Sequence, residues 1–133
     1  MRNERVLIDV AGAVATITLN RPDKGNALSA EMMDALDARI GEALAEETVR
    51  VIVLAANGKI FCAGHDLEEM LGHDEKAWQR AHFDRCSRLM MSIRQAPKPF
   101  IARVQGAAVA AGCQLVATCD LAYAVETAKF GIN

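Results

Sequence analysis

The sequence predicts an α/β fold in which strands and helices alternate along a single domain. Short β-branched or apolar runs of strand length recur along the 133 residues, and segments with helical apolar spacing separate most of them. Two of these runs are continuously apolar, which is typical of strands buried in parallel sheets. The length corresponds to one domain or part of one, since domains cluster around 100–150 residues.

The first expected element is a β-hairpin. Val6–Val10 and Val14–Leu19 are short β-branched runs, and Ala11-Gly12-Ala13 separates them. The segment that follows, Asn20–Asn26, reads N-R-P-D-K-G-N and is dense in turn formers. We therefore expect two paired strands followed by a tight loop.

A helix is expected next, with Ser29 as its N-cap because a serine hydroxyl accepts a hydrogen bond from the first turn. Its apolar stripe has helical spacing and consists of Met32, Met33, Leu36, Ile40 and Leu44. The helix should end near Ala45–Thr48. Val49–Ala55 then predicts a strand that is buried on both faces and parallel to a neighbour.

The second half of the chain repeats this alternation. A long amphipathic helix is expected to start around Glu75–Trp78 and to end before Pro97. Its stripe comprises Phe83, Cys86, Leu89, Met90 and Ile93. Phe100–Val104 predicts a buried strand, Ala110–Thr118 a helix and Leu121–Val125 another strand. The expected order is therefore β-β-α-β-α-β-α-β.

Composition and charge exclude several classes of function. The formal net charge is −2 and no basic stripe is present, so a nucleic-acid partner is not expected. Residues 1–10 lack the apolar stretch of a signal peptide, and no apolar run approaches the ~18 residues of a membrane span. The cysteines form no C-x-x-C pair, which predicts reduced thiols in a cytoplasmic protein without a metal site. They are Cys62, Cys86, Cys113 and Cys119.

Two segments have a strand, a loop of small residues and then a helix or an acidic stretch. They are Ile60–Met70 (I-F-C-A-G-H-D-L-E-E-M) and Gln105–Leu115 (Q-G-A-A-V-A-A-G-C-Q-L), here called the first and second elbow. Small side chains let a ligand reach backbone N–H groups at a helix start, so two facing elbows could form an oxyanion hole. Tight helix–sheet packing is the alternative. We expect parallel strands at Val51–Leu54 and Phe100–Val104, with the elbows adjacent at their ends.

Four motifs in order carry a resemblance to a known family. They are L-N-R-P-D-K-G-N-A-L at Leu19–Leu28, F-C-A-G-H-D-L-E-E-M at Phe61–Met70, P-K-P-F-I-A-R-V-Q-G at Pro97–Gly106, and A-A-G-C-Q-L-V-A-T-C-D-L at Ala110–Leu121. The chain resembles the N-terminal half of the crotonase superfamily, the enoyl-CoA hydratase/isomerase family. The resemblance implies a ClpP/crotonase-like spiral of β-β-α units, with residues 1–133 as the N-terminal part of one domain, truncated before the C-terminal helical region.

The resemblance also implies the substrate and the assembly. An acyl-CoA thioester would bind with its carbonyl oxygen between the backbone N–H groups of His65 and Ala111. Coenzyme A belongs to the substrate, so no separate cofactor is expected, and the subunits would form homo-trimers or hexamers. The implied substrate-binding positions are Lys24, Ala27, Ala63, Gly64, His65, Asp66, Leu67 and Gly112. Lys24 is a candidate for the CoA phosphates, with an ordinary exposed turn lysine as the alternative.

Two positions depart from the family pattern. Gln114 occupies the position of the first catalytic glutamate, and a carboxamide orients water but cannot act as a base. The second glutamate of the family would follow the segment Lys129–Asn133, where this chain ends. His65 replaces a common alanine, and its imidazole can point into the acyl pocket or out to solvent.

The resemblance therefore implies an enoyl-CoA hydratase/isomerase-type lyase of fatty acid metabolism that stabilises a thioester enolate. The alternatives are an isomerase, a decarboxylase, a thioester hydrolase or a non-catalytic acyl-CoA binder.

Around the site, His82 and Trp78 are expected to be packing or rim residues. A solvated acidic face is expected from Asp66, Glu68, Glu69, Asp74 and Glu75. Because the apolar strands and helices look incompletely covered, we expect a fragment of a longer polypeptide or a surface completed by neighbouring subunits.

Overall fold

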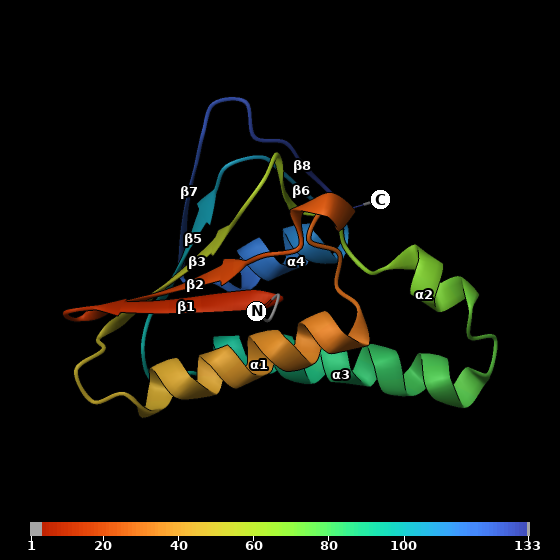
Figure 1. The fold of residues 1–133 in the computed structure, drawn as a ribbon, viewed down its shortest axis with the longest axis horizontal. Helices are drawn as coiled ribbons and strands as arrows, with labels where there is room; N and C mark the ends of the chain where they lie inside the picture. The colour runs from red at the N-terminus through yellow and green to blue at the C-terminus, as the bar shows by residue number, and fades with distance from the viewer. Residues whose placement is uncertain (1–3, 133) are drawn as a thin grey trace.

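A five-stranded sheet forms the frame of the computed structural model, which describes residues 4–132 (Figure 1). Its strand order is β1-β2-β3-β5-β7. The hairpin prediction is confirmed, since β1 (Val6–Ala11) and β2 (Val14–Leu19) pair antiparallel. Ala11 pairs directly with Val14, so the turn is one residue shorter than expected. Gly12 adopts a φ of 60°, which suits such a tight hairpin.

Two long helices pack side by side below the sheet in the view of Figure 1. α1 (Ala30–Ala45) begins as predicted, because the Ser29 Oγ accepts a hydrogen bond from the Met32 N–H at 3.1 Å. The second helix, α3 (Lys76–Arg94), starts within the expected range. Between the hairpin and α1 lies a short 3-10 helix, η1 (Pro22–Lys24), in the predicted turn segment.

One expected core residue of α3 is wrong. Phe83 is 45% exposed, whereas the preceding His82 is only 2% exposed. His82 lies four residues before Cys86, so both share the helix face that continues through Leu89 and Ile93. Phe83 is turned away from that stripe and contacts the ring of His65 instead.

The predicted parallel pairing is confirmed. β3 (Val51–Ala56) and β5 (Phe100–Val104) pair in parallel, with Ile52 opposite Phe100. The expectation that the first of these strands is buried on both faces is only partly met. Val51, Val53 and Ala56 of β3 are half-buried, because α1 and α3 cover one face of the sheet and the described chain leaves the other more open. β7 (Leu121–Ala124) pairs with β5 and is exposed along its length.

A second, three-stranded parallel sheet was not predicted. It consists of β4 (Ile60–Cys62), β6 (Ala107–Val109) and β8 (Phe130–Gly131), in the order β4-β6-β8. Strands of two or three residues are too short to produce a periodic apolar signal. α2 (Leu67–Leu71) follows β4, and α4 (Ala111–Thr118) follows β6. Each elbow therefore leaves a strand of this small sheet, which corrects the expectation that the elbows sit directly at the ends of β3 and β5.

The core lies between the large sheet and the two long helices, with the small sheet and α4 closing one end. Its largest fully buried side chains include Phe61 of the first elbow and Leu115 of the second. Phe61 thus anchors the first elbow in the core, and Leu115 anchors the second. Within residues 4–132, no helix combines the length and hydropathy that crossing a bilayer requires.

Candidate active site

The two elbows lie against each other. β4 and β6 are neighbours in the small sheet, with Cys62 opposite Ala108. A Cβ added to Gly112 would overlap the Cys62 carbonyl group, at 2.8 Å from its carbon. A Cβ on Gly64 would lie 3.4 Å from the Ala111 nitrogen. Glycine at these two positions therefore lets the backbones of the elbows come into direct contact.

The backbone is strained at the tip of the second elbow. Ala110, the N-cap of α4, has φ 52° and ψ −125°, a conformation that L-residues rarely adopt. Holding an alanine there costs about 1–3 kcal/mol, and strain of this kind gathers at functional sites. On the first elbow, Gly64 has φ 97° and carries no such penalty because it lacks a Cβ.

The N–H groups of His65 and Ala111 have no backbone acceptor within residues 4–132, and neither do those of Gly64 and Gly112 beside them. Leu28 donates to the Gly64 carbonyl at 2.7 Å, and Gln114 donates to the Ala110 carbonyl at 3.1 Å. Ala111 is the first residue of α4, where a backbone N–H has no partner inside the helix. Each of the two adjacent elbows thus presents backbone N–H groups without backbone acceptors, among them the two that the sequence-based assignment names.

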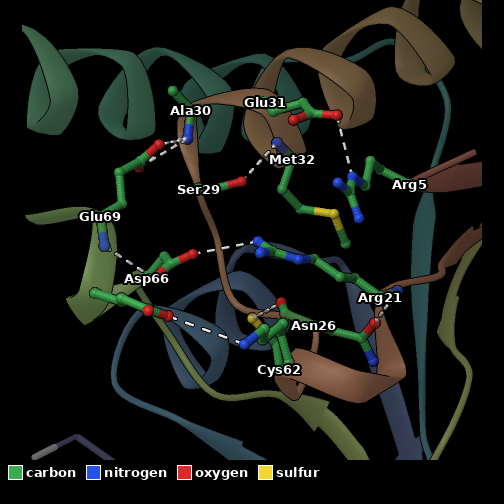
Figure 2. A network of polar contacts seen from close by, with 12 residues as sticks. Arg5, Arg21, Asn26, Ser29, Ala30, Glu31, Met32, Cys62, Asp66 and Glu69 are labelled. Atoms are coloured by element: carbon green, nitrogen blue, oxygen red, sulfur yellow. Dashed lines mark hydrogen bonds and ion pairs between the residues drawn. The ribbon is translucent and has the colours of Figure 1, made fainter.

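Asn26 fixes the first elbow from behind, and sequence reasoning identified it only as a turn former. It is fully buried with a φ of 54°. Its Nδ2 donates to the carbonyls of Asn57 at 2.9 Å and Ile60 at 3.0 Å, while its Oδ1 accepts from the Arg21 N–H at 2.7 Å. Its own carbonyl accepts from the Cys62 Sγ (Figure 2). Asparagine's tolerance of positive φ was the signal available in the sequence.

Asp66 and Glu69 are structural residues, which corrects their assignment to a solvated face. Asp66 Oδ2 accepts from Arg21 Nη1 at 3.2 Å, and the two side chains are only 14% and 16% exposed (Figure 2). Asp66 Oδ1 caps α2 through the Glu69 N–H at 3.1 Å. The Glu69 carboxylate accepts from the Ala30 N–H at the start of α1. The remaining members of the expected face are exposed: Glu68, Asp74 and Glu75.

The other sequence-predicted positions surround the elbows. Ala27 is buried behind the first elbow, in the loop that carries Asn26. The exposed positions there are Ala63 and Leu67, the latter 70% exposed. Lys24 is exposed in η1, with its Nζ 3.9 Å from Glu68 Oε2. Gln114 is exposed in the first turn of α4.

A row of stacked rings runs from the first elbow along the start of α3. The His65 ring lies 5.2 Å from that of His82 and 5.1 Å from that of Phe83, in the second case edge-on. Trp78 stacks on His82 at 4.6 Å, and His73 stacks on Trp78 at 4.0 Å. The prediction that His82 and Trp78 are packing residues is thus confirmed. No sequence pattern indicated that all three histidines of the chain would meet in one cluster.

Both inner histidines are kept neutral by their surroundings. Burial lowers the pKa of His65 below its ordinary value of 6.5, and the nearby His82 lowers it further. Burial also lowers the pKa of His82, against the opposing effect of Glu69. Neither His65 Nδ1 nor the two ring nitrogens of His82 have a hydrogen-bond partner within residues 4–132. The closest carboxylate oxygen, Glu69 Oε1, lies 3.8 Å from His82 Nε2.

Three of the four thiols are held in the protonated form by burial. Burial raises the pKa of Cys62 to about 11 and that of Cys119 to about 12, and it also raises the pKa of Cys86. These three side chains are therefore protonated at neutral pH and are not nucleophiles. No group of three or more histidine, cysteine, aspartate or glutamate side chains in residues 4–132 is arranged to hold a metal ion.

The family model described as enoyl-CoA hydratase/isomerase matches residues 9–133. The chain belongs to this family. It is 42% identical over 130 residues to the mitochondrial enoyl-CoA hydratase domain-containing protein 3 of Danio rerio, covering 96% of this chain and 45% of that protein. It is 43% identical over 131 residues to a probable enoyl-CoA hydratase of Rhizobium meliloti, covering 98% of this chain and 50% of that protein.

Solved structures of the enoyl-CoA hydratase/isomerase family confirm the crotonase-like fold. An enoyl-CoA hydratase of Mycobacterium smegmatis superposes with a TM-score of 0.93 at 49% identity, over 96% of this chain and 50% of that one. Human enoyl-CoA hydratase domain-containing protein 3 superposes with a TM-score of 0.90 at 37% identity, over 95% of this chain and 50% of that one. The chain therefore spans about half the length of the family members it matches.

Proposed function

We propose that this chain forms the oxyanion-hole half of an acyl-CoA site, in an enzyme that stabilises the enolate of a thioester. The single observation that carries the proposal is the direct contact of the two elbows, whose tips present backbone N–H groups without backbone acceptors. The donors are those of His65 and Ala111, and the ligand atom they suit is the thioester carbonyl oxygen. The family's name supports a CoA thioester as the substrate class.

Charge on that oxygen is what the two donors would stabilise. When the α-carbon loses a proton, the electron pair moves onto the thioester oxygen, and fixed N–H dipoles stabilise it without reorganising. Losing one such donor typically lowers the rate by about 10²–10³. Lys24, on the rim beside the first elbow, is our candidate for the CoA phosphates. The main chain of Ala63–Leu67 is the proposed adenine contact.

Hydration itself is not the only chemistry this arrangement supports. Gln114 cannot ionise, so a water molecule at the second elbow has no carboxylate base from that position. Isomerisation, decarboxylation and thioester hydrolysis also need a stabilised oxyanion and can use other proton-transfer groups. A non-catalytic acyl-CoA binder is the second candidate, and the exposed, uncharged Gln114 is the observation that favours it.

The experiment removes one backbone N–H donor and measures the C=O stretching frequency of the bound thioester. In the full-length protein that carries this chain, butyryl-CoA labelled with ¹³C at its carbonyl should show a lowered C=O stretching frequency when bound. Ala111→Pro removes the N–H at the first position of α4, where proline is otherwise tolerated, and should return that frequency towards its free value. Lys76→Pro places proline at the same position of α3 and is the matched control. An unchanged frequency in wild type would refute the oxyanion hole.

The assembly and the compartment complete the proposal. A homo-trimer or hexamer would bury apolar side chains that the described chain leaves open, which include Leu121, Tyr123, Phe130 and Ile132. Sedimentation analysis of the full-length protein tests this. Cytoplasmic localisation stays a prediction, and fractionation of cells that express the protein tests it.

A further inference from the structure

His65 contributes both a backbone N–H and an imidazole to the first elbow of the candidate site. Its N–H has no backbone acceptor, and its side chain is a half-buried imidazole with an unpartnered, buried Nδ1. The other ionisable side chain of that elbow, Asp66, is held by Arg21 and by the cap of α2. Among the described residues at the tips of the two elbows, His65 therefore supplies the free proton-accepting group.

Covalent geometry places this imidazole near the reacting atoms. Its ring nitrogens lie within about 5 Å of the N–H of the same residue, whichever rotamer is adopted. An oxygen bound by that N–H would be about 3 Å away from it. The α-carbon of the acyl group is separated from that oxygen by only two bonds. When the ring is turned towards the acyl group, a ring nitrogen is therefore within reach of the α-proton, directly or through one water molecule.

The surroundings of the ring hold it and keep it neutral. His82 packs at 5.2 Å and Phe83 packs edge-on at 5.1 Å, so α3 restricts the ring from one side. The charged and titratable groups that act on His65 are His82 and Glu69, and those that act on His82 also include Arg85, His73 and Asp66. Because burial opposes the imidazolium form, His65 is a free base at neutral pH.

We infer that the His65 imidazole is the proton-transferring group of this site, with His82 as a positioning residue behind it; the inference rests on the proposed function. The imidazole lone pair takes the α-proton and the C–H bond breaks. The electron pair of that bond moves to the thioester oxygen between the two N–H donors. The imidazolium then returns the proton to the α-carbon or to a conjugated carbon. Nothing is oxidised or reduced, and no further reactant is required.

The test measures exchange of the α-protons of butyryl-CoA in D₂O by ¹H NMR, using the full-length protein. His65→Phe keeps an aromatic ring against His82 and keeps the backbone N–H, but it cannot accept a proton. Exchange should slow by about 10²–10⁴-fold. The Kd for butyryl-CoA, measured by calorimetry, should change little because the donor is retained. His73→Ala alters the exposed end of the same ring row and should leave exchange unchanged.

A second variant separates proton transfer from packing. His82→Phe retains a buried ring but removes the neighbour that lowers the pKa of His65. The acid limb of the exchange rate, which lies below pH 6.5 in wild type, should move to higher pH. A purely structural role for His82 would change the rate at every pH without moving the limb. His65→Gln provides a second substitution at the same position, and circular dichroism confirms that each variant is folded.

Each outcome bears on one of the two proposals. If wild type binds butyryl-CoA and lowers its carbonyl frequency but exchanges no α-protons, the role of His65 is wrong and the oxyanion hole stands. Exchange that survives in both folded His65 variants, or that is lost in Gln114→Ala instead, also refutes the role of His65. If wild type does not bind butyryl-CoA at all, the proposed function is refuted, and the role of His65 is refuted with it.

Discussion

Gly112 lies so close to Cys62 that a Cβ on the glycine would overlap the cysteine carbonyl group. This contact is between backbones, so neither side can yield by rotating a side chain. The spacing of the two elbows is therefore set by the absence of a single methyl group. The same holds more weakly at Gly64, where a Cβ would lie 3.0 Å from that of Ala110.

Gly112→Ala should separate the elbows. We expect a loss of about 1–3 kcal/mol of unfolding free energy from overpacking, together with weaker acyl-CoA binding. Denaturant unfolding and calorimetric titration measure the two effects. Gly41→Ala is the control, because Gly41 is exposed in α1 and an added Cβ there meets nothing within 4 Å. That change should stabilise the protein by about 0.5–1 kcal/mol. Equal effects at the two glycines would contradict the proposed contact.

Asn26→Ala should be among the most destabilising polar substitutions in the chain. It leaves the carbonyls of Asn57 and Ile60 without their donor and places alanine at a φ of 54°. We expect a loss of about 2–4 kcal/mol in urea unfolding, from the unpaired buried groups and the backbone strain together. Asn26→Gly relieves the strain alone and should recover about 1 kcal/mol of this loss. A loss below that of an ordinary surface change would show that these bonds are dispensable.

The Arg21–Asp66 pair should contribute more than the exposed ion pairs. Asp66→Asn keeps the cap on α2 but removes the charge, and Arg21→Met removes the partner while keeping an apolar stem. Either change should cost about 1–3 kcal/mol because both side chains are largely buried. A double-mutant cycle isolates the pairwise coupling. The cycle for Arg85 and Asp34, which are 39% and 67% exposed, should give about 0–1 kcal/mol.

Stability should fall on mild acidification because the two inner histidines are buried in the neutral form. Their folded-state pKa values lie below the ordinary 6.5, so the unfolded chain binds more protons in the interval between. Their contribution is fully present above about pH 6.5 and is lost as the pH falls through the lowered values. The Tm measured from pH 7.5 to pH 5 should show this decline. His82→Phe should flatten it, whereas His73→Ala should leave it in place.

Gln114→Glu tests how much of the hydratase machinery is present. If Gln114 merely replaces the missing base, the substitution in the full-length protein should raise crotonyl-CoA hydration by about 10²-fold or more. Loss of the substrate's ultraviolet absorbance measures it directly. Gln114→Asn, which shortens the side chain without adding charge, is the control. No gain in the hydration rate would mean that the site lacks more than one of the groups that hydration requires.

The long elements were predictable from the sequence for a simple reason. α1, α3, β3 and β5 each repeat one periodicity over several turns or residues, and Ser29 supplies an explicit helix start. The small sheet was not predictable, because its strands contain two or three residues. Their pairing depends on strands that are distant along the chain, as when Cys62 pairs with Ala108 and Ala108 with Phe130.

Within the site, residue type was enough to predict the roles of some residues but not of others. The elbows were singled out because their small residues follow apolar strands, whereas Ala111 was assigned as a donor only through the family resemblance. Asp66 and Glu69 looked like surface charges, since a sequence cannot show that Arg21 and the first turn of α1 come to meet them. His65 meets His82 because of the way α3 is rotated about its own axis. The apolar stripe predicted from the sequence put Phe83 on the buried face of α3, whereas the neighbouring His82 lies there.

The parallel pairing of Cys62 with Ala108 has a kinetic consequence. The whole of α3 and β5 lies between these two strands along the chain, so the entropy of loop closure disfavours early formation of the contact. Structures dominated by such distant pairings fold in about milliseconds to seconds, slower than helical bundles. The hairpin of β1 and β2 forms from neighbouring residues and is free to appear early. Ligand-binding competence should therefore emerge in the final phase of refolding, after most of the helical signal has been recovered.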